Sequence, residues 1–295
     1  AKAAGYTPIW GVEYVREIAD IYEANLGEHL IVDSLLNVDP SGLKSPTLLH
    51  ASPPCPNFST AKNGGRETEN DFALAKKVAE FLDVLRPEFF TLENVYQYRN
   101  SKSWAIIARA LYECGYAFDY WHLCAADFGV PQTRRRMIVK ARRDGAGVVP
   151  CAATHAENPE PTFFGMLPRW VSWLEAIRGM VSSLPEREFM PYQRRELSDV
   201  LDDVVLVDGA NASPPIQYRS ADRPAFTMTA MCPRKHPHIF RGEDGVSRFA
   251  TVACRAAWQS FPDSFVLPKC DRLANRVVGN AVPPLLAEVV AGSFL

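Results

Sequence analysis

The feature that most constrains this sequence is a pattern in its first half, where short apolar runs alternate with longer stretches of helical spacing. The clearest helical stretch keeps apolar side chains on one face and stops before Pro87. The expected strands cover residues 8–12, 30–32, 48–51, 89–92, 116–124 and 137–141, and the expected helices cover 14–26, 72–86 and 104–114. Strands that alternate with helices in this way predict an α/β protein with a doubly wound sheet.

The pattern breaks at about Asp144. Prolines become frequent beyond this point, the helix signals shorten, and regular alternation is lost until a final apolar helix near the C-terminus. We therefore expect two domains. One consists of residues 1–144 together with 273–295, and the second is a smaller, irregular domain over residues 145–272.

The composition indicates the cellular compartment and excludes several classes of protein. Hydrophobic residues make up 47% of the chain, but no run approaches the ~20 apolar residues of a membrane span. The N-terminus does not resemble a signal peptide. The seven cysteines never form a Cys-x-x-Cys pair, so neither a disulfide framework nor a zinc site is indicated. We expect a cytoplasmic protein with reduced thiols, no metal and no membrane contact.

The net charge of −2 hides an asymmetry along the chain. Residues 1–130 hold 11 Lys and Arg against 17 Asp and Glu, whereas residues 131–295 hold 21 against 17. Basic side chains cluster at 134–136, 140–143 and 194–195. A polyanionic partner and a merely solvated basic surface both fit this pattern.

One thiol stands out because of where the expected strand 48–51 stops. Pro53 and Pro54 end the pairing because they have no N–H to donate, so Cys55 follows a carboxyl end of the sheet, where α/β proteins bind ligands. Such a thiol is a candidate nucleophile, although free cysteines more often serve as small buried hydrophobes. Three other apolar runs end in the carboxylates Glu13, Asp33 and Glu93.

Four short motifs follow one another along the chain: Pro53-Pro54-Cys55, Glu93-Asn94-Val95, Gln132-Thr133-Arg134-Arg135-Arg136 and Arg276-Val277-Val278-Gly279-Asn280. In order and spacing they resemble the motifs of the cytosine C5 DNA methyltransferases, and the resemblance spans most of the chain. It implies a Rossmann-like methyltransferase sheet, with residues 145–272 as a target-recognition domain. It also implies S-adenosylmethionine as the methyl donor, S-adenosylhomocysteine as the product, and double-stranded DNA as the partner.

The resemblance also assigns catalytic roles, and chemistry explains why those residue types are needed. Cytosine C5 is a poor nucleophile, so a thiolate, here Cys55, first adds to C6 of a base swung out of the duplex. Glu93 stabilises the charge that develops toward N3, and Arg134 and Arg136 stabilise the charge near O2. Arg135, between them, is expected to point away.

Further residues match the family's binding positions. Those expected to contact the cofactor are Glu13, Tyr14, Asp33, Pro54, Leu74 and Asn280. Those expected to contact DNA are Ser59, Gln132, Arg219, Arg234 and Lys235. The family's glycine-rich first motif is expected upstream of Ala1. We further expect a monomer that functions beside a restriction endonuclease.

Two other functions remain open at this stage. One branch of the same family modifies transfer RNA with the same Pro-Pro-Cys site, but its characteristic Cys-Phe-Thr tripeptide does not occur here. A non-catalytic DNA-binding protein that keeps the fold without holding the cofactor is the second alternative. Binding of S-adenosylmethionine would distinguish this second alternative from the DNA methyltransferase and the transfer RNA methyltransferase.

Overall fold

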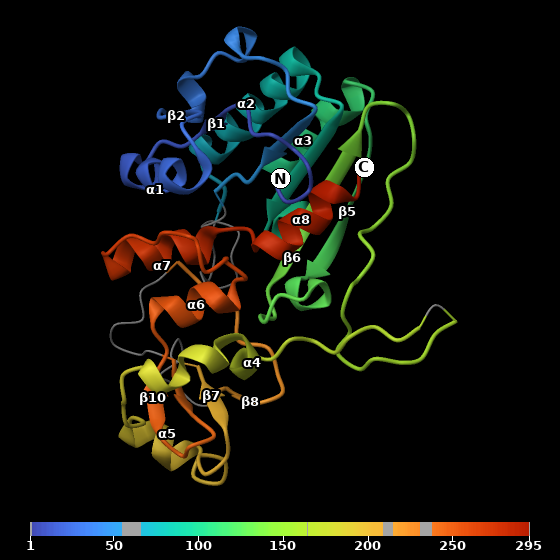
Figure 1. Ribbon diagram of the computed structural model, residues 1–295. Helices are drawn as coiled ribbons and strands as arrows, with labels where there is room; N and C mark the ends of the chain where they lie inside the picture. Colours follow the sequence, from blue (N-terminus) through green and yellow to red (C-terminus); the bar gives the residue numbers. More distant parts are fainter. Residues whose placement is uncertain (1, 55–65, 164, 209–214, 231–237, 295) are drawn as a thin grey trace. The chain divides into compact units, whose positions relative to one another are not determined.

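The computed structural model describes residues 2–54, 66–163, 165–208, 215–230 and 238–294. Its chain divides into two compact units, and each is described by itself (Figure 1). Unit 1 consists of Ala1–Cys124, Arg135–Ala152 and Ala287–Leu295, and unit 2 of Ala125–Arg134 and Ala153–Leu286. The sequence pattern placed the boundaries elsewhere, because it did not indicate that residues 125–134 leave unit 1 between two of its strands.

The main sheet of unit 1 has four strands in the order β3-β4-β6-β5. The strands are β3 (Leu48–Ala51), β4 (Phe89–Asn94), β5 (Ala117–Cys124) and β6 (Arg135–Arg142). Strands β3 and β4 are parallel, whereas β6 runs antiparallel to both β4 and β5. The α/β class is confirmed, but the sheet is mixed, because the chain returns from β5 to insert β6 beside β4.

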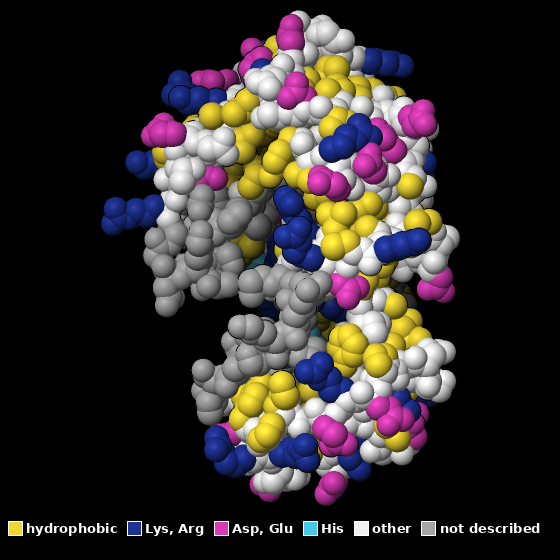
Figure 2. Space-filling view, turned by 90° about the vertical axis from the view of Figure 1, so that its left-hand side faces the viewer, with side chains coloured by type: hydrophobic (Ala, Val, Ile, Leu, Met, Phe, Trp, Pro, Cys, Tyr) yellow, Lys and Arg dark blue, Asp and Glu magenta, His cyan; other side chains and the backbone are white. Residues whose placement is uncertain are grey.

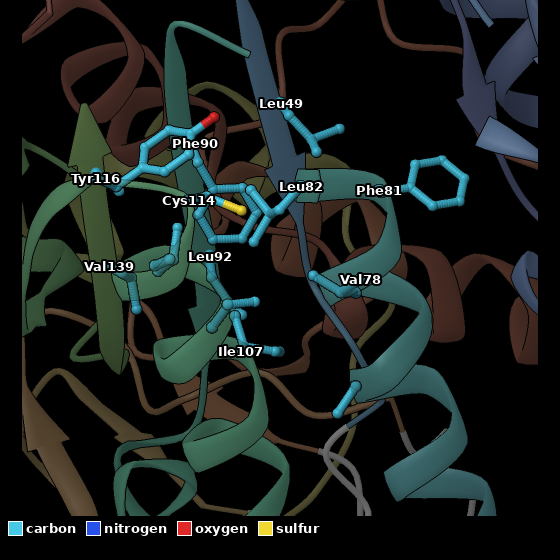
Figure 3. Packing of buried hydrophobic residues seen from close by; sticks show 14 of the residues in the cluster. Leu49, Val78, Phe81, Leu82, Phe90, Leu92, Ile107, Cys114, Tyr116 and Val139 are labelled. Atoms are coloured by element: carbon cyan, nitrogen blue, oxygen red, sulfur yellow. The ribbon is translucent and has the colours of Figure 1, made fainter. Parts of the chain in front are cut away.

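One face of this sheet is covered by the long helices α2 (Glu69–Leu85) and α3 (Lys102–Glu113), whose side chains pack on those of β4 and β6 (Figure 3). Alternate residues of β4, Phe90 and Leu92, are fully buried in this cluster. Burying such a side chain contributes roughly 1.5–3 kcal/mol, so this cluster is the main core of unit 1. Helix α2 starts three residues before its expected beginning, because Thr68 caps it in a capping box with Asp71.

The other face of the sheet meets the C-terminal segment. Phe89 of β4 stacks on Phe294, with ring centroids 4.7 Å apart, just beyond α8 (Pro284–Gly292). Lys140 of β6 is only 2% exposed; its ammonium donates to the Val149 carbonyl at 3.0 Å and lies 5.0 Å from the Phe294 ring. Burial lowers the pKa of this lysine. Residues on both faces are therefore covered, as a doubly wound sheet requires.

A smaller parallel pair lies near the N-terminus. It consists of β1 (Gly11–Val12) and β2 (Leu30–Ile31), joined by α1 (Arg16–Leu26). Single turns of 3-10 helix follow at η1 (Leu35–Asn37) and η2 (Pro40–Gly42), and a longer one, η3 (Tyr96–Asn100), links β4 to α3. Because β1 and β2 are parallel neighbours, their carboxyl ends lie side by side.

Unit 2 is built around an antiparallel sheet in the order β10-β9-β7-β8. Its strands are β7 (Val205–Val207), β8 (Tyr218–Ser220), β9 (Ile239–Arg241) and β10 (Ser247–Phe249). Its helices are η4 (Ala125–Phe128), α4 (Trp173–Ile177), η5 (Arg178–Ser183), α5 (Pro191–Glu196), α6 (Val252–Trp258) and α7 (Asp271–Asn280). The elements are short, in agreement with the irregular texture of the sequence in this region. Trp173, Phe240 and Trp258 are fully buried in its core.

A close backbone contact joins α7 to the rest of unit 2. A Cβ on Gly279 would lie 2.2 Å from the carbonyl carbon of Thr229 and 2.4 Å from the amide nitrogen of Ala230. Only a glycine allows the two backbones to approach this closely. The glycine of the last sequence motif is therefore needed for packing within unit 2.

Two properties of the surface bear on partners. None of the helices in the described parts of the chain is both long and apolar enough to cross a membrane. On the face drawn in Figure 2, Lys and Arg side chains are interspersed with Asp and Glu, and hydrophobic areas lie between them.

Candidate active site

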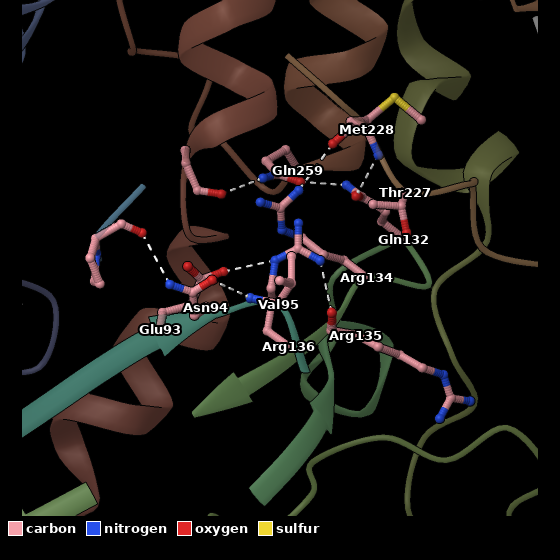
Figure 4. A network of polar contacts seen from close by, with 12 residues as sticks. Glu93, Asn94, Val95, Gln132, Arg134, Arg135, Arg136, Thr227, Met228 and Gln259 are labelled. Atoms are coloured by element: carbon pink, nitrogen blue, oxygen red, sulfur yellow. Dashed lines mark hydrogen bonds and ion pairs between the residues drawn. The ribbon is translucent and has the colours of Figure 1, made fainter. Parts of the chain in front are cut away.

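The carboxyl end of strand β4 carries the expected catalytic carboxylate. Glu93 is still inside the strand, paired with Ile138 of β6, although the sequence suggested that the strand would end at Leu92. Successive side chains of a strand point to opposite faces, and directly paired residues point to the same face. Ile138 therefore shares a face with Glu93, and so does Arg136, two residues before Ile138. Arg136 Nε lies 2.9 Å from Glu93 Oε1, and both side chains are largely buried (Figure 4). The structure thus brings together two of the four predicted catalytic residues.

The neighbouring Asn94 connects this strand to the predicted nucleophile's turn. Its amide nitrogen donates to the Pro53 carbonyl at 3.1 Å, and its amide oxygen accepts from the Val95 N–H at 2.8 Å. Asn94 is 1% exposed. The side chain therefore holds the chain at residue 53, two residues before Cys55. Cys55 and Ser59 themselves lie outside the described residues.

The three consecutive arginines have three different surroundings. Arg136 pairs with Glu93, and its guanidinium also donates to the Arg135 carbonyl at 2.8 Å. Arg135 is exposed, and its guanidinium points away from that of Arg136 in Figure 4, as the alternation predicts. Arg134 belongs to unit 2, where it is 2% exposed and donates to the Met228 carbonyl at 3.0 Å.

The position of Gln132 corrects one predicted DNA contact. Its side chain is completely buried in unit 2, donates to the Trp258 carbonyl at 3.2 Å and to the Gln259 amide oxygen, and accepts from the Met228 N–H at 2.8 Å. All of these bonds would have to break before the amide could reach a nucleotide. Gln132 is therefore a structural hub of unit 2, a role that a five-residue motif cannot reveal, because its partners lie 96 and 126 or more positions away.

The predicted cofactor residues near the N-terminus lie on adjacent strand ends. The Glu13 N–H donates to the Ile31 carbonyl at 3.2 Å, so Glu13 follows β1 where Asp33 follows β2. One Glu13 oxygen accepts from the Val15 N–H at 2.8 Å, and Asp33 Oδ1 accepts from the Ser34 N–H at 2.6 Å. The Tyr14 ring is 67% exposed. The two carboxylates and this ring form a surface on which a ribose and a purine ring could be held.

Two further predicted cofactor residues share a small pocket in unit 1. It is a shallow hollow lined by Pro53, Pro54, Asp71, Leu74, Tyr98 and Ser103. The sequence pointed to Pro54 and Leu74 but missed the polar members. Burial, followed by the carboxylates of Glu67 and Asp71, raises the pKa of Tyr98, so its hydroxyl stays protonated. The sequence signal for two of the missed residues is their position, because Tyr98 and Ser103 lie three and eight residues after the Glu93-Asn94-Val95 motif.

The remaining predicted residues fall in unit 2. Asn280 is the last residue of α7 and is exposed. Arg219 of β8 is only partly exposed, its guanidinium lies 4.5 Å over the Phe226 ring, and burial lowers its pKa. Arg234 and Lys235 lie outside the described residues. Part of the Arg219 side chain is thus packed against the Phe226 ring, and its expected contact with DNA stays a prediction.

The other thiols of the described chain differ from one another in exposure. Cys114, Cys124, Cys151 and Cys254 are buried, and Cys270 is exposed. No group of three or more His, Cys, Asp or Glu side chains is arranged to hold a metal ion within the ranges that the structure describes.

Comparison with known proteins agrees with this geometry. The family model for C-5 cytosine-specific DNA methylases matches residues 1–295. The chain belongs to that family. As a member it is an enzyme, a DNA (cytosine-5)-methyltransferase, and the resemblance inferred from the four motifs is confirmed.

Related proteins support the assignment over most of the length of the methyltransferase. Type II methyltransferase M1.HphI of Haemophilus parahaemolyticus is 30% identical over 99% of this chain and 82% of its own. Type II methyltransferase M.SacI of Streptomyces achromogenes is 29% identical over 88% and 74%. Among solved structures, the Dnmt2 methyltransferase of Schizosaccharomyces pombe has a TM-score of 0.64 at 16% identity, covering 99% of this chain and 91% of that one. This last likeness supports the fold alone.

Proposed function

We propose that the methyltransferase transfers a methyl group to C5 of cytosine within a specific double-stranded DNA sequence, through a covalent bond between Cys55 and C6 of a flipped-out base. The observation that carries this proposal is the pairing of Glu93 with Arg136 at 2.9 Å on the sheet edge where Asn94 holds Pro53. These contacts gather a carboxyl group, a guanidinium and the turn that leads to a thiol, which are the groups that the addition needs.

In this mechanism each side chain acts on a stated atom of cytosine. The Cys55 thiolate adds to C6, which moves electron density through C5 toward N3 and O2 and makes C5 nucleophilic. Glu93 donates a hydrogen bond or proton at N3, and Arg136, and in our proposal Arg134, stabilise the charge near O2. After methylation, a base takes the C5 proton, the bond from C6 to sulfur breaks with Cys55 leaving as a thiolate, and the C5–C6 double bond is restored.

S-adenosylmethionine is the proposed methyl donor. The chain's residues fit it, because Glu13 and Asp33 place two acceptors on adjacent strand ends beside the exposed Tyr14 ring. Pro54 and Leu74, which line one pocket, and Asn280 are proposed to contact it as well. When bound, the cofactor supplies the methyl group, and these side chains orient it.

The decisive test uses double-stranded DNA with 5-fluorocytosine at the target. Fluorine cannot leave C5 as a cation, so the enzyme should remain covalently attached after methyl transfer, and a denaturing gel should show a slow band that requires S-adenosylmethionine. Cys55→Ser should abolish the band, because a hydroxyl stays protonated at neutral pH. Cys270→Ser is the matched control, since Cys270 is an exposed thiol outside the motifs. An adduct that persisted in Cys55→Ser would contradict the mechanism.

The role of Glu93 is tested on the same substrate. Glu93→Gln should slow adduct formation by roughly 100-fold while changing DNA affinity much less, because the carboxyl group acts on charge that develops in the transition state. Glu88→Gln removes an exposed carboxylate just before the other end of β4 and should react like the natural protein. Equal rates for the two variants would remove Glu93 from the mechanism.

Sequence specificity is proposed to lie in residues 145–272, with base or phosphate contacts from Arg219, Arg234 and Lys235. Replacing a phosphate contact weakens binding to all sequences and flattens its salt dependence, whereas replacing a base contact relaxes one position of the site. Exchange of this region with that of a relative should change the methylated sequence. The Type II names of the relatives support a pairing with a restriction endonuclease.

Two alternatives are separated by simple measurements. A transfer RNA methyltransferase would methylate transfer RNA transcripts in preference to duplex DNA. A non-catalytic DNA-binding protein would not bind S-adenosylmethionine in calorimetry. The match to the family model for C-5 cytosine-specific DNA methylases favours the DNA methyltransferase over both.

A further inference from the structure

A basic and aromatic cluster in unit 1 has no part in the proposed methyl transfer; it consists of Tyr96, Arg99, His122 and Arg135. Tyr96 and Arg99 lie on η3. A 3-10 helix has three residues per turn, so their side chains lie one above the other, and the guanidinium carbon is 4.2 Å from the centre of the Tyr96 ring. The His122 ring of β5 stacks on the same tyrosine, with ring centroids 3.9 Å apart.

Arg135 of β6 brings a second guanidinium to this stack. In the register of β5 and β6, His122 is paired with Met137, two residues after Arg135. His122 and Arg135 are therefore diagonal neighbours on one face of the sheet, opposite to the face of Arg136 (Figure 4). Burial, followed by the charges of Arg135 and Arg99, lowers the pKa of His122. Both guanidiniums thus lie near the same imidazole.

The positive charge of this cluster is not neutralised by any residue that the structure describes. Within those residues Arg136 is paired with Glu93, but neither Arg99 nor Arg135 forms an ion pair with a carboxylate. The Arg99 Nε atom is buried and has no hydrogen-bond partner in the same ranges. A buried donor without a partner costs free energy, and like charges repel each other, so such an arrangement is typical of a site that an anion completes.

The position of the cluster favours DNA as this anion. His122 near the end of β5 and Arg135 at the start of β6 lie at the same sheet edge as the Glu93–Arg136 pair. DNA carries one negative charge per about 1.7 Å of helix axis, and the guanidinium fork matches two phosphate oxygens. A strand that delivers a cytosine to Glu93 keeps its sugar–phosphate backbone outside the pocket, where side chains along this edge can meet it.

We propose that Arg99 and Arg135 form a phosphate-binding site of unit 1 that holds the DNA backbone beside the flipped cytosine, with the Tyr96 and His122 rings as its platform. The inference rests on the proposed function, because Glu93 must receive the base. It adds DNA contacts outside residues 145–272. Phosphates are the same in every sequence, so these contacts hold the strand without selecting the site.

The test measures binding of the whole protein to a fluorescent duplex that carries its methylation site, by anisotropy over a series of salt concentrations. Each phosphate contact contributes about 0.9 to the slope of log affinity against log salt concentration. The double variant Arg99→Gln/Arg135→Gln should therefore lower the slope by about 2. At low salt its affinity should fall by about tenfold or more, and this deficit should shrink as the salt concentration rises.

Two further variants separate a phosphate contact from general charge and from damage to η3. Arg143→Gln removes the same charge from an exposed residue just beyond the other end of β6, and it should keep the natural slope. Arg135→Gln alone replaces an exposed side chain, so it should keep the natural thermal stability while lowering the slope by about 1.

The outcomes are distinct. A natural slope in both Arg135→Gln and the double variant overturns the proposal, and the ligand of the cluster would then be another anion or an acidic protein. An equal fall in Arg143→Gln also overturns it, because the effect would come from net charge. A fall confined to the variants of Arg99 and Arg135 supports it. Failure of the proposed function is recognised separately, as an adduct that survives Cys55→Ser.

Discussion

Different kinds of interaction stabilise the interiors of the two units of this methyltransferase. The core of unit 1 is an apolar cluster between the sheet and the helices α2 and α3, and its buried polar side chains include Glu93 and Asn94 at the end of β4. Unit 2 has buried Gln132, Arg134, Arg255 and Gln259, whose side chains bond to backbone carbonyls or to one another. Apolar packing follows sequence periodicity, whereas each polar bond depends on one particular partner.

This difference matters for function. A core built on periodic apolar residues tolerates variation in detail and provides a stable platform for the catalytic side chains. Buried polar side chains, which unit 2 adds to its apolar core, fix one arrangement of short elements, because every unpaired group costs free energy. The predictions below test this comparison, from the largest expected effect to the smallest.

Removing volume from the core of unit 1 should have the largest effect. Leu82 of α2 is 0% exposed within the apolar cluster, so Leu82→Ala should lower the free energy of unfolding of unit 1 by roughly 4 kcal/mol. Hydrogen exchange of peptides from β4 and α3 measures this loss. Val84→Ala, at a site 45% exposed on the same helix, should cost less than about 1 kcal/mol. Similar losses at both positions would show that the cluster is not the core.

Adding a methyl group at the close backbone contact of Gly279 should lower the free energy of unfolding of unit 2 by about 3 kcal/mol. The Cβ in Gly279→Ala would meet the backbone of Thr229, which cannot move as a flexible side chain could. Exchange of α6 and α7 peptides reports the loss. Gly42→Ala in unit 1, where a Cβ would meet nothing within 4 Å, is the control and should be nearly neutral. A tolerated Gly279→Ala would remove the packing reason for this motif glycine.

The hydrogen bonds of Gln132 should contribute about 2 to 3 kcal/mol to the free energy of unfolding of unit 2. In Gln132→Leu the Met228 N–H and the Trp258 carbonyl lose a buried partner, and each unsatisfied group costs roughly 1–3 kcal/mol. Chemical denaturation followed by tryptophan fluorescence measures the change. Thr91→Val in unit 1 removes a buried hydroxyl bonded to His50 at 2.9 Å and should cost about 1 kcal/mol. If Thr91→Val cost more, the contrast between the units would fail.

Acid should weaken unit 2 through a buried histidine. His238 is 5% exposed, and burial, followed by the charge of Arg255, lowers its pKa to about 3. The unfolded chain then binds more protons than the folded one between about pH 6.5 and pH 3, so stability is present above pH 6.5 and falls as the pH drops. At pH 5 the loss from this group should be about 2 kcal/mol.

The histidine variant isolates this effect. The difference in unfolding free energy between the natural protein and His238→Gln should be constant above about pH 7.5 and should shrink by about 2 kcal/mol at pH 5. A difference that did not change with pH would show that His238 titrates normally in the folded protein.

The physical differences between the units also explain what could be predicted from the sequence. The helices around residues 72–86 and 104–114 and the strand at 48–51 were predicted within a few residues, because apolar periodicity decides them. The motifs led directly to Glu93 and Arg136, which the structure pairs. The mixed direction of β6 was not predicted, because strand direction depends on where the chain returns, and no local signal records that.

The sequence by itself determined the class of fold, the family and the chemical groups of the candidate site, since these depend on residue types and their order. Only the tertiary structure decided that Gln132 is a buried hub, that Arg134 and Arg136 belong to different units, and that His122 stacks on Tyr96. These three facts rest on hydrogen bonds and packing between residues far apart in the chain. Their partners are set by the path of the backbone in space, which no periodicity or short motif encodes.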